Sequence, residues 1–318
     1  MTETLRLAPA DLDRAAALLR AGRVVAFPTE TVYGLGADAT DPEAVVRIYA
    51  AKERPRFNPL IAHVPDAASA MREGVFDEAA RALAQAFWPG PLTLVVPRAT
   101  EGRVCDVARA GLETVALRVP AHPLAERLLA AAARPIVAPS ANRSGRVSPT
   151  AAEHVLADLD GRIAAVLDGG ETEVGVESTI VACTGGAPRL LRPGGVPRAA
   201  LERVLGRSLE GAGPGIQAPG MLASHYAPAA RVRLDVAAIR PGEAALLFGP
   251  TPPAGVETAA ARLNLSERGD LAEAAARLFS FLRRLDAAGV ETIAVAPIPA
   301  DGLGEAIRDR LARAAAER

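Results

Sequence analysis

Apolar and polar residues alternate along this chain with spacings typical of both helices and strands. In residues 9–21, Leu12, Ala15 and Leu19 recur on one helical face, so a helix is predicted there. Short apolar runs predict strands at residues 24–27, 60–64, 92–96, 114–119, 136–138, 163–167 and 178–181. Helical patterns lie between or after these runs, at residues 42–52, 77–87, 121–133, 150–158 and 197–205. This alternation predicts an α/β sheet with flanking helices.

The helix expected at residues 42–52 has clear start and stop signals. Asp41 suits the N-cap, and Pro42 suits the first helical position. Because Pro55 disfavours helix in the residue before it, this helix is expected to end near Lys52. The segment TETVYGLG, residues 29–36, is interpreted as a loop that leads into this part of the chain.

The composition changes after residue 205. Residues 206–220, GRSLEGAGPGIQAPG, are rich in glycine and proline and predict a linker. Beyond the linker, the pattern predicts strands at residues 231–234, 243–248 and 291–296, and helices at residues 270–287 and 303–316. The length of 318 residues fits about two domains. We expect a first domain in residues 1–205, a linker in residues 206–228 and a smaller α/β domain in residues 229–318.

Charge and cysteine content narrow the functional class. The 36 basic and 37 acidic residues give a net charge of −1, which argues against a protein that mainly grips a polyanion. Cys105 and Cys183 fit no metal-site spacing and favour a reducing compartment. No stretch approaches 18 uninterrupted apolar residues, so a cytoplasmic protein without membrane association is expected. HExxH, paired CxxC and GxSxG motifs are absent, which leaves zinc and serine hydrolases without support.

One lysine stands among 35 arginines. Lys52 lies between Ala51 and Glu53, so it belongs to no P-loop, which requires a Gly-Lys-Ser/Thr sequence. Two interpretations stay open at this point: chance survival in an arginine-rich chain, or retention for the chemistry of the ammonium group.

Basic residues gather where the predicted helix ends. Lys52, Arg54 and Arg56 place three cations within five residues, and such cations are the usual partners of a polyphosphate. A solvated basic turn is the alternative. Arg118, at the end of a predicted strand, needs an anion if it is buried, which a substrate carboxylate or an internal Asp or Glu would supply equally well. Nothing in the sequence distinguishes five acidic residues from solvated surface charge: Glu30, Asp38, Glu171, Glu173 and Glu177.

Several segments together resemble a known family. PTETVYGLGADAT, KERPRFNPLIAHV, ETVALRVP, APSANRSGRVSPT, VGVESTIV and LRPGGV resemble, in order and spacing, the YrdC-like domain of threonylcarbamoyl-AMP synthases. MLASHYAP and the C-terminal segment resemble the long, two-domain form of these enzymes. The resemblance implies a YrdC-like domain with a twisted mixed sheet, followed by a smaller Rossmann-like α/β domain. Two positions depart from the family's usual pattern, since this chain has Ala182 and Ala218 where an acidic residue and a serine are frequent.

The resemblance also implies a reaction and a set of site residues. The family joins L-threonine, bicarbonate and ATP into threonylcarbamoyl-adenylate and pyrophosphate, and a separate transferase complex uses the product to modify tRNA. Mg²⁺ would be carried mainly by ATP and not by protein ligands, and tRNA would be contacted weakly or only indirectly. The residues expected at ATP are Lys52, Arg54, Asn58, Thr114, Ser140, Asn142, Ser148, Arg192 and Tyr226. Those expected at threonine are Thr31, His63, Arg118 and Ser178.

A carbamate formed from threonine and bicarbonate would attack the α-phosphorus, which needs positioning and charge neutralisation more than a covalent nucleophile. The linker, with His225 and Tyr226 just after it, is expected to act as an active-site lid. Three alternatives stay open: a double-stranded-RNA-binding module, a carbamoyl-transfer maturation factor with the same nucleotide fold, and a family member that only binds nucleotide.

Overall fold

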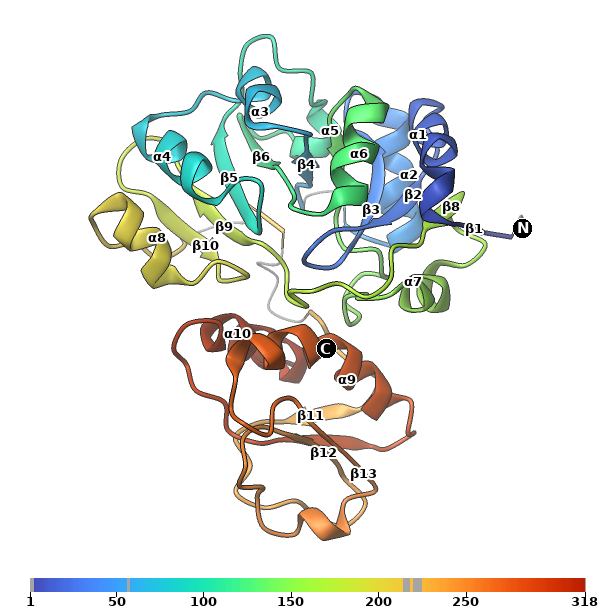
Figure 1. Cartoon of the computed structure of the whole chain (residues 1–318), viewed down its shortest axis with the longest axis vertical. Coiled ribbons are helices and arrows are strands. Elements are labelled where there is room, and N and C mark those ends of the chain that lie inside the picture. Colours follow the sequence, from blue (N-terminus) through green and yellow to red (C-terminus); the bar gives the residue numbers. More distant parts are fainter. Residues whose placement is uncertain (1–2, 56–57, 214–217, 220–224, 318) are drawn as a thin grey trace.

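The chain forms two α/β units, each built around its own sheet (Figure 1). The computed structural model describes residues 3–55, 58–213, 218–219 and 225–317. Arg56 and parts of the predicted linker, residues 214–217 and 220–224, lie outside the described residues. Among the described residues, no helix combines the length and the apolar character that crossing a membrane requires.

The larger unit contains a mixed sheet. Its strands are β1 (Leu5–Leu7), β2 (Val25–Pro28), β3 (Tyr33–Asp38), β4 (Ile61–His63), β5 (Leu92–Pro97), β6 (Thr114–Arg118), β7 (Ile136–Val137), β8 (Ala165–Leu167), β9 (Thr179–Ala182) and β10 (Arg189–Arg192). Within the described part of the chain, their order is β1-β8-β2-β3-β7-β4-β6-β5-β9-β10. The sheet contains both parallel pairs, such as β4 with β6, and antiparallel pairs, such as β5 with β6. The expected mixed sheet is confirmed.

Helices cover both faces of this sheet. They are η1 (Pro9–Asp11), α1 (Leu12–Arg20), α2 (Pro42–Lys52), α3 (Ala67–Glu73), α4 (Glu78–Phe87), α5 (Asp106–Arg109), α6 (Pro123–Ala132), α7 (Ala152–Leu159) and α8 (Arg198–Leu205). On β2, Val25 and Phe27 join the apolar cluster of α1 and α6, whereas Ala26 joins that of α2, α4, α7 and α8. This alternation within one strand buries both faces of the sheet.

Helix α2 begins and ends as predicted. The Asp41 side chain accepts a hydrogen bond from the backbone N–H of Glu43 at 2.9 Å, and Pro42 occupies the first turn. Glu53 follows in the left-handed conformation with a φ of 53°, so the helix ends at Lys52. Asp41 and Pro42 define the start of α2, and Glu53 defines its end. The only lysine of the chain therefore has a defined position in the last turn of the helix.

The expected loop at residues 29–36 is wrong in its second half, because β3 begins at Tyr33. Its glycines weaken a strand signal, yet the sheet needs them. A Cβ on Gly36 would lie 2.8 Å from Phe27 Cε1, and one on Gly34 would lie 3.0 Å from the Cβ of Ala138. The pattern also missed β1, α3, α5 and β10, which are short elements.

The described part of the predicted linker is not free of structure. Glu210 forms a parallel bridge with Arg189 of β10 and donates a backbone hydrogen bond to Pro188. Ala218 is fully buried in an apolar cluster that includes Ala182. Since both positions that depart from the family pattern lie in this cluster, alanine fits each of them.

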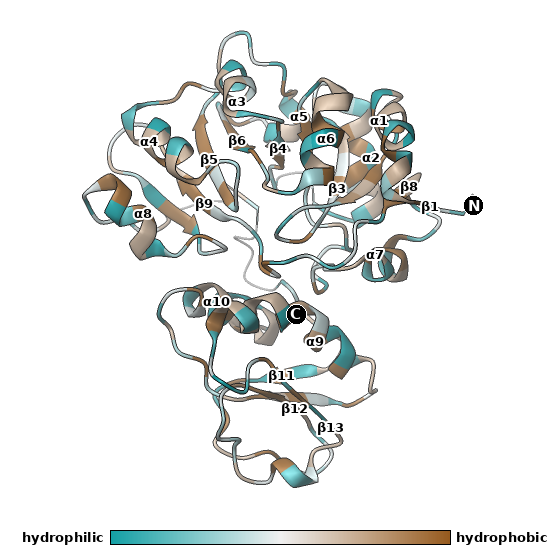
Figure 2. Cartoon of the chain, in the orientation of Figure 1, coloured by the Kyte–Doolittle hydropathy of each residue, from teal (hydrophilic) through white to brown (hydrophobic). Residues whose placement is uncertain are grey.

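The smaller unit has a parallel sheet. Its strands, β11 (Arg231–Arg233), β12 (Ala244–Leu247), β13 (Ala261–Asn264) and β14 (Thr292–Val295), lie in the order β11-β14-β12-β13 among the described residues. Helices α9 (Leu271–Asp286) and α10 (Gly304–Ala315) lie on the face of the sheet that looks toward the larger unit, while the 3-10 helix η2 (Val256–Thr258) packs with the other face. Figure 2 shows apolar residues along the strands of both sheets and more polar ones on the outer helix faces. A smaller C-terminal α/β unit was predicted and is confirmed, although β13 was missed.

Candidate functional site

The predicted site residues meet where several strands end. His63, at the end of β4, lies beside Arg118, at the end of β6, because these two strands pair in that register. Together with other side chains they line a narrow cavity of about 40 Å³. The predicted residues in its wall are Arg54, His63, Arg118, Ser140, Ser178, Arg192 and Tyr226. Arginine therefore dominates the charge of the wall.

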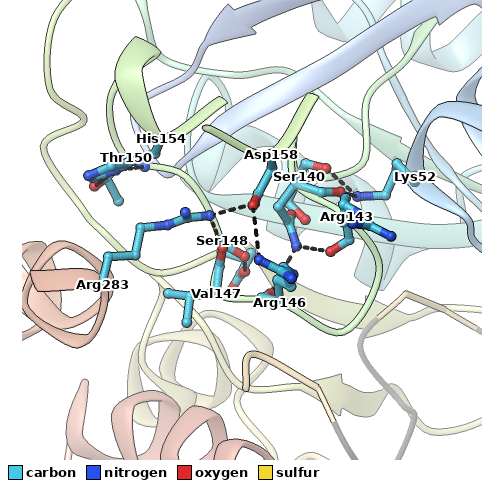
Figure 3. Close-up of polar contacts among 12 residues, drawn as sticks. Lys52, Ser140, Arg143, Arg146, Val147, Ser148, Thr150, His154, Asp158 and Arg283 are labelled. Carbon is cyan, nitrogen blue, oxygen red and sulfur yellow. Dashed lines mark hydrogen bonds and ion pairs between the residues drawn. The ribbon is translucent and has the colours of Figure 1, made fainter. Parts of the chain in front are cut away.

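Lys52 is buried, with 2 % of its surface exposed. Its Nζ donates to the backbone oxygens of Ser140 at 2.5 Å and of Asn142 at 2.6 Å. Figure 3 shows the lysine pointing to the segment that carries Ser140, Arg143 and Ser148. Burial, followed by the charge of Arg54, holds the lysine pKa well below its usual range. The ammonium therefore joins the end of α2 to the Ser-Ala-Asn turn.

Arg54 and Asn58 are buried beside this turn. The Arg54 Nη2 donates to the backbone oxygens of Asn58 at 3.4 Å and of Pro59 at 3.1 Å, and burial lowers its pKa to about 10. The Arg54 Nε, the Asn58 Oδ1 and the Asn142 Oδ1 have no hydrogen-bond partner among the described residues. Buried polar atoms of this kind are the ones that a ligand satisfies.

Arg118 has an internal partner. Its Nη2 lies 2.8 Å from Glu30 Oε2 and donates to Thr31 Oγ1 at 2.9 Å. Of the two anions left open by the sequence, the internal carboxylate is present, so Glu30 is buried and not a solvated surface charge. Burial, together with the charge of Arg118, lowers the pKa of His63 to about 3, so this imidazole is neutral at neutral pH.

Ser178 and Arg192 contact each other in the cavity wall. Arg192 donates from Nε at 3.2 Å and from Nη2 at 2.8 Å to the backbone oxygen of Ser178. The hydroxyls of Ser178 and Thr93 lie 2.8 Å apart, which orients the serine side chain. The backbone oxygen of Ser178, just before β9, thereby holds the guanidinium group of Arg192 at the cavity.

Ser148 donates to Glu177 Oε1 at 2.5 Å, and Glu177 Oε2 accepts from Arg310 Nε at 2.8 Å. Burial alone would raise the Glu177 pKa, but Arg310, Arg192 and the hydrogen bond from Ser148 lower it to about 2. Glu177 is therefore a buried, charged member of the cavity wall, unlike the surface residue that the sequence allowed.

Tyr226 completes the wall from the far end of the predicted linker. Its ring stacks on Phe279 of α9 at 5.6 Å, and the His225 ring meets it edge-on at 4.1 Å. Tyr226 has a φ of 62°, a conformation that a non-glycine residue adopts only when its surroundings enforce it. Contacts from the smaller unit thus fix its position.

Six predicted residues are not part of the described cavity wall: Thr31, Lys52, Asn58, Asn142, Ser148 and Thr114. Thr31, Lys52, Asn58 and Ser148 are hydrogen-bonded to residues of the wall, and Asn142 is hydrogen-bonded to Lys52. Thr114 lies at the opposite end of β6 from Arg118, where it pairs with Pro97.

Comparison with known proteins identifies the family. Residues 17–194 match the family model described as "Telomere recombination" (Sua5_yciO_yrdC), and residues 196–316 match the model of the threonylcarbamoyl-AMP synthase C-terminal domain. The chain is 43% identical to the threonylcarbamoyl-AMP synthase of Bacillus subtilis, covering 100% of this chain and 96% of that protein. It is 42% identical to the enzyme of the same name from Pyrococcus abyssi, covering 96% and 94%.

The chain belongs to the threonylcarbamoyl-AMP synthase family. The crystal structure of P. abyssi Sua5 complexed with L-threonine superimposes with a TM-score of 0.89 at 38% identity, covering 99% of this chain and 98% of that one. The YrdC-like fold of the larger unit and the two-unit form of the family, both expected from the motifs, are therefore confirmed.

Three charged residues in or beside the cavity wall were not assigned to the site from the sequence: Glu30, Glu177 and Arg310. The first two lie inside recognised motifs, which was the only signal for them. Arg310 is one of 35 arginines and lies on an ordinary amphipathic helix. In contrast, Glu171 and Glu173 are exposed, and Asp38 is buried against Arg134 at 2.6 Å.

A metal held by the protein would need clustered histidine, carboxylate or thiolate ligands. The described residues contain no group of three or more His, Cys, Asp or Glu side chains placed to hold an ion. Glu177 lies in the cavity wall and pairs with Arg310, and Glu30 pairs with Arg118 of the same wall. These residues do not fit a resident metal centre.

Proposed function

We propose that this protein synthesises L-threonylcarbamoyl-adenylate from L-threonine, bicarbonate and ATP with release of pyrophosphate, for threonylcarbamoyladenosine modification of tRNA. It would thus act as a nucleotidyltransferase. The observation that carries the proposal is the buried wall of Arg54, Arg118 and Arg192 around one cavity in a chain of this family. A buried cation-rich cavity suits anionic substrates.

The two substrates would occupy opposite parts of the site. Arg118, Thr31, His63 and Ser178 would hold threonine, with the arginine binding its carboxylate. Arg118 would then exchange or share its contact with Glu30. ATP would lie along the turn fixed by Lys52, and its binding residues would be Lys52, Arg54, Asn58, Ser140, Asn142, Ser148, Arg192 and Tyr226. Thr114 remains a predicted ATP contact, although it lies away from the cavity wall.

The chemistry needs placement more than a nucleophilic side chain. The threonine nitrogen and bicarbonate form a carbamate with loss of water, and a carbamate oxygen then attacks the α-phosphorus as pyrophosphate leaves. Arg54 and Arg192 would neutralise phosphate charge, and their burial strengthens that effect. Mg²⁺, carried by ATP oxygens and water, would add to this neutralisation. The residues themselves orient the reactants in line and exclude water.

The wider assignments are predictions. The product would pass to a separate threonylcarbamoyl transferase complex, with tRNA contacted indirectly or weakly, and the protein would act in the cytoplasm. The boundaries 1–205, 206–228 and 229–318 remain those expected from composition. The lid expected in residues 206–228 stays a prediction, since residues 214–217 and 220–224 lie outside the described residues.

One assay tests the reaction. Pyrophosphate release is measured with ATP, threonine and bicarbonate, and again with each component omitted. We expect release only with all three, and release without threonine or without bicarbonate would contradict the proposal. ATP binding without turnover would indicate a nucleotide-binding relative, and salt-dependent RNA binding tighter than ATP binding would favour the RNA-binding alternative.

A further inference from the structure

The smaller unit packs directly against three segments of the active site. Val32, Val147 and Val176, which flank site residues of the larger unit, are buried in the same apolar cluster as Phe279 of α9 and Ile307 of α10. The core of the smaller unit therefore continues beneath the cavity.

Arg310 is the charged residue at the centre of this contact. It comes from α10, and 0 % of its surface is exposed. Its Nε donates to Glu177 Oε2 at 2.8 Å, its Nη1 donates to Asp309 Oδ2 at 2.6 Å, and its guanidinium carbon lies 5.2 Å from the centre of the Tyr226 ring. A cation over an aromatic face and a charge-assisted hydrogen bond both restrict their partners to one geometry.

Two of the three partners of Arg310, Glu177 and Tyr226, lead to the proposed ATP site. Glu177 uses its second oxygen to accept the hydroxyl of Ser148, and it lies one residue before Ser178. Tyr226 is itself in the cavity wall. Arg310 does not line the cavity. Its influence on a bound substrate would therefore pass through Glu177 and Tyr226.

We infer that Arg310 is a positioning residue of the C-terminal domain, which holds Ser148 through Glu177, and Tyr226 through its ring, in the arrangement that binds ATP. This inference rests on the proposed function. It gives α10 a role in nucleotide affinity that a helix outside the catalytic fold would not otherwise have.

The loss of ATP affinity in an Arg310 variant should depend on pH, because Glu177 must stay charged to accept hydrogen bonds from both Ser148 and Arg310. Burial favours protonation of Glu177, and its arginine neighbours oppose it. Loss of Arg310 removes one of these charges, so the Glu177 pKa rises. Protonated Glu177 has one fewer acceptor for Ser148. The other titratable or charged groups that act on Glu177 or respond to its charge are Lys52, Arg192, His225 and Tyr226, while Asp309 acts on Arg310, Arg192 and Tyr226.

The groups around Glu177 are not expected to cause the same pH dependence of ATP affinity. Burial lowers the pKa of His225 to about 3, so it stays neutral where the experiment is made. Arg192 and Lys52 remain in every variant. The γ-phosphate of ATP titrates equally with all variants, so the ratio of dissociation constants between variant and wild type isolates the protein's contribution.

The experiment compares full-length wild type, Arg310→Gln, Arg310→Lys and the control Arg308→Gln. Arg308 lies on the same helix but pairs with Asp235 of the smaller unit, and 43 % of its side chain is exposed. ATP affinity is measured by calorimetry between about pH 5.5 and about pH 8. Hydrogen exchange of residues 146–150 and 171–178 is measured without any ligand.

Arg310→Gln is expected to raise the Kd for ATP about tenfold or more at neutral pH, as loss of a charge-assisted hydrogen bond implies. The Kd ratio is expected to rise further as the pH falls, and exchange in both segments to accelerate. Arg310→Lys is expected to restore much of the affinity and to remove the pH dependence, because its charge can still pair with Glu177. Arg308→Gln is expected to behave as wild type.

Wild-type affinity, pH dependence and exchange in folded Arg310→Gln would overturn the inference. If this variant melts below the assay temperature, the double variant Arg310→Met with Glu177→Gln leaves no unpaired buried charge. It is expected to bind ATP weakly without the added pH dependence, and wild-type affinity in it would equally overturn the inference. If wild type does not bind ATP, the proposed function fails, while the exchange data still decide whether Arg310 holds the two segments.

Discussion

Lys52 illustrates how one side chain joins two parts of the active site. Its compact ammonium group lies between the backbone oxygens of Ser140 and Asn142, at the point where α2 ends. A planar guanidinium is larger and presents its donors in a fixed fork. Arginine at this position would have to fit that larger group into a site where only 2 % of the Lys52 surface is exposed. The retention of lysine in an arginine-rich chain thus has a physical reason in the geometry of this turn.

We therefore expect Lys52→Arg to lose most activity while the protein still folds. A displaced turn moves the proposed phosphate contacts, and small misplacements at an active site reduce rates by roughly 10- to 100-fold. Pyrophosphate release measures the loss, and thermal unfolding checks the fold. Arg47→Lys, on the exposed side of the same helix, is the matched control and should have wild-type turnover. Near-wild-type turnover of Lys52→Arg would instead support the interpretation that the lysine survives by chance.

At the scale of elements, local signals predicted some features and missed others for identifiable reasons. The Asp41 cap and the apolar pattern of residues 270–287 predicted α2 and α9 because both signals act within one helix. Strand β3 was missed because its glycines are required by neighbours that are distant in sequence.

The same distinction applies to the site. Motifs placed Arg54 and Arg118 in it, but no local pattern pairs Glu177 with a residue 133 positions away. Contacts of this kind depend on the tertiary fold. Sequence reasoning therefore found the residues that recognised motifs contain, and it left the charge network around them unassigned.

The N-cap of α2 is expected to make a measurable contribution to the free energy of unfolding. Asp41→Ala removes the acceptor for the backbone N–H of Glu43 and is expected to lower the free energy of unfolding by about 1 kcal/mol. Asp41→Asn keeps a capping oxygen and should lie close to wild type. Urea unfolding of the three proteins makes the comparison. Equal losses in both variants would show that the carboxylate charge, and not the cap, stabilises this end of the helix.

At the scale of the whole molecule, the described residues form three ion pairs that connect the two units. Arg198 pairs with Glu305 at 2.6 Å, and Asp158 pairs with Arg283 at 2.8 Å. The third pair joins Glu177 to Arg310. Arg283 also donates to the backbone oxygen of Val147, next to Ser148 (Figure 3). The segment from Ser140 to Ser148 is thus held by Lys52 at one end and by the smaller unit at the other. The proposed ATP site is completed by both units.

Gly175 offers a direct test of this dependence on the smaller unit. It has a φ of 75°, and a Cβ there would lie 2.3 Å from the backbone oxygen of Ala275 and 2.4 Å from the Cα of Ala276, both in α9. Gly175→Ala is expected to push residues 171–178 away from α9, which separates Glu177 from Arg310, lowers the melting temperature and raises KM for ATP. Gly186→Ala is the matched control, because its φ is 82° and a Cβ would meet nothing within 4 Å. The control carries the same backbone strain without the clash, so only the difference between the variants reports on the domain contact. Equal KM values for ATP in the two variants would mean that the contact with α9 does not shape the nucleotide site.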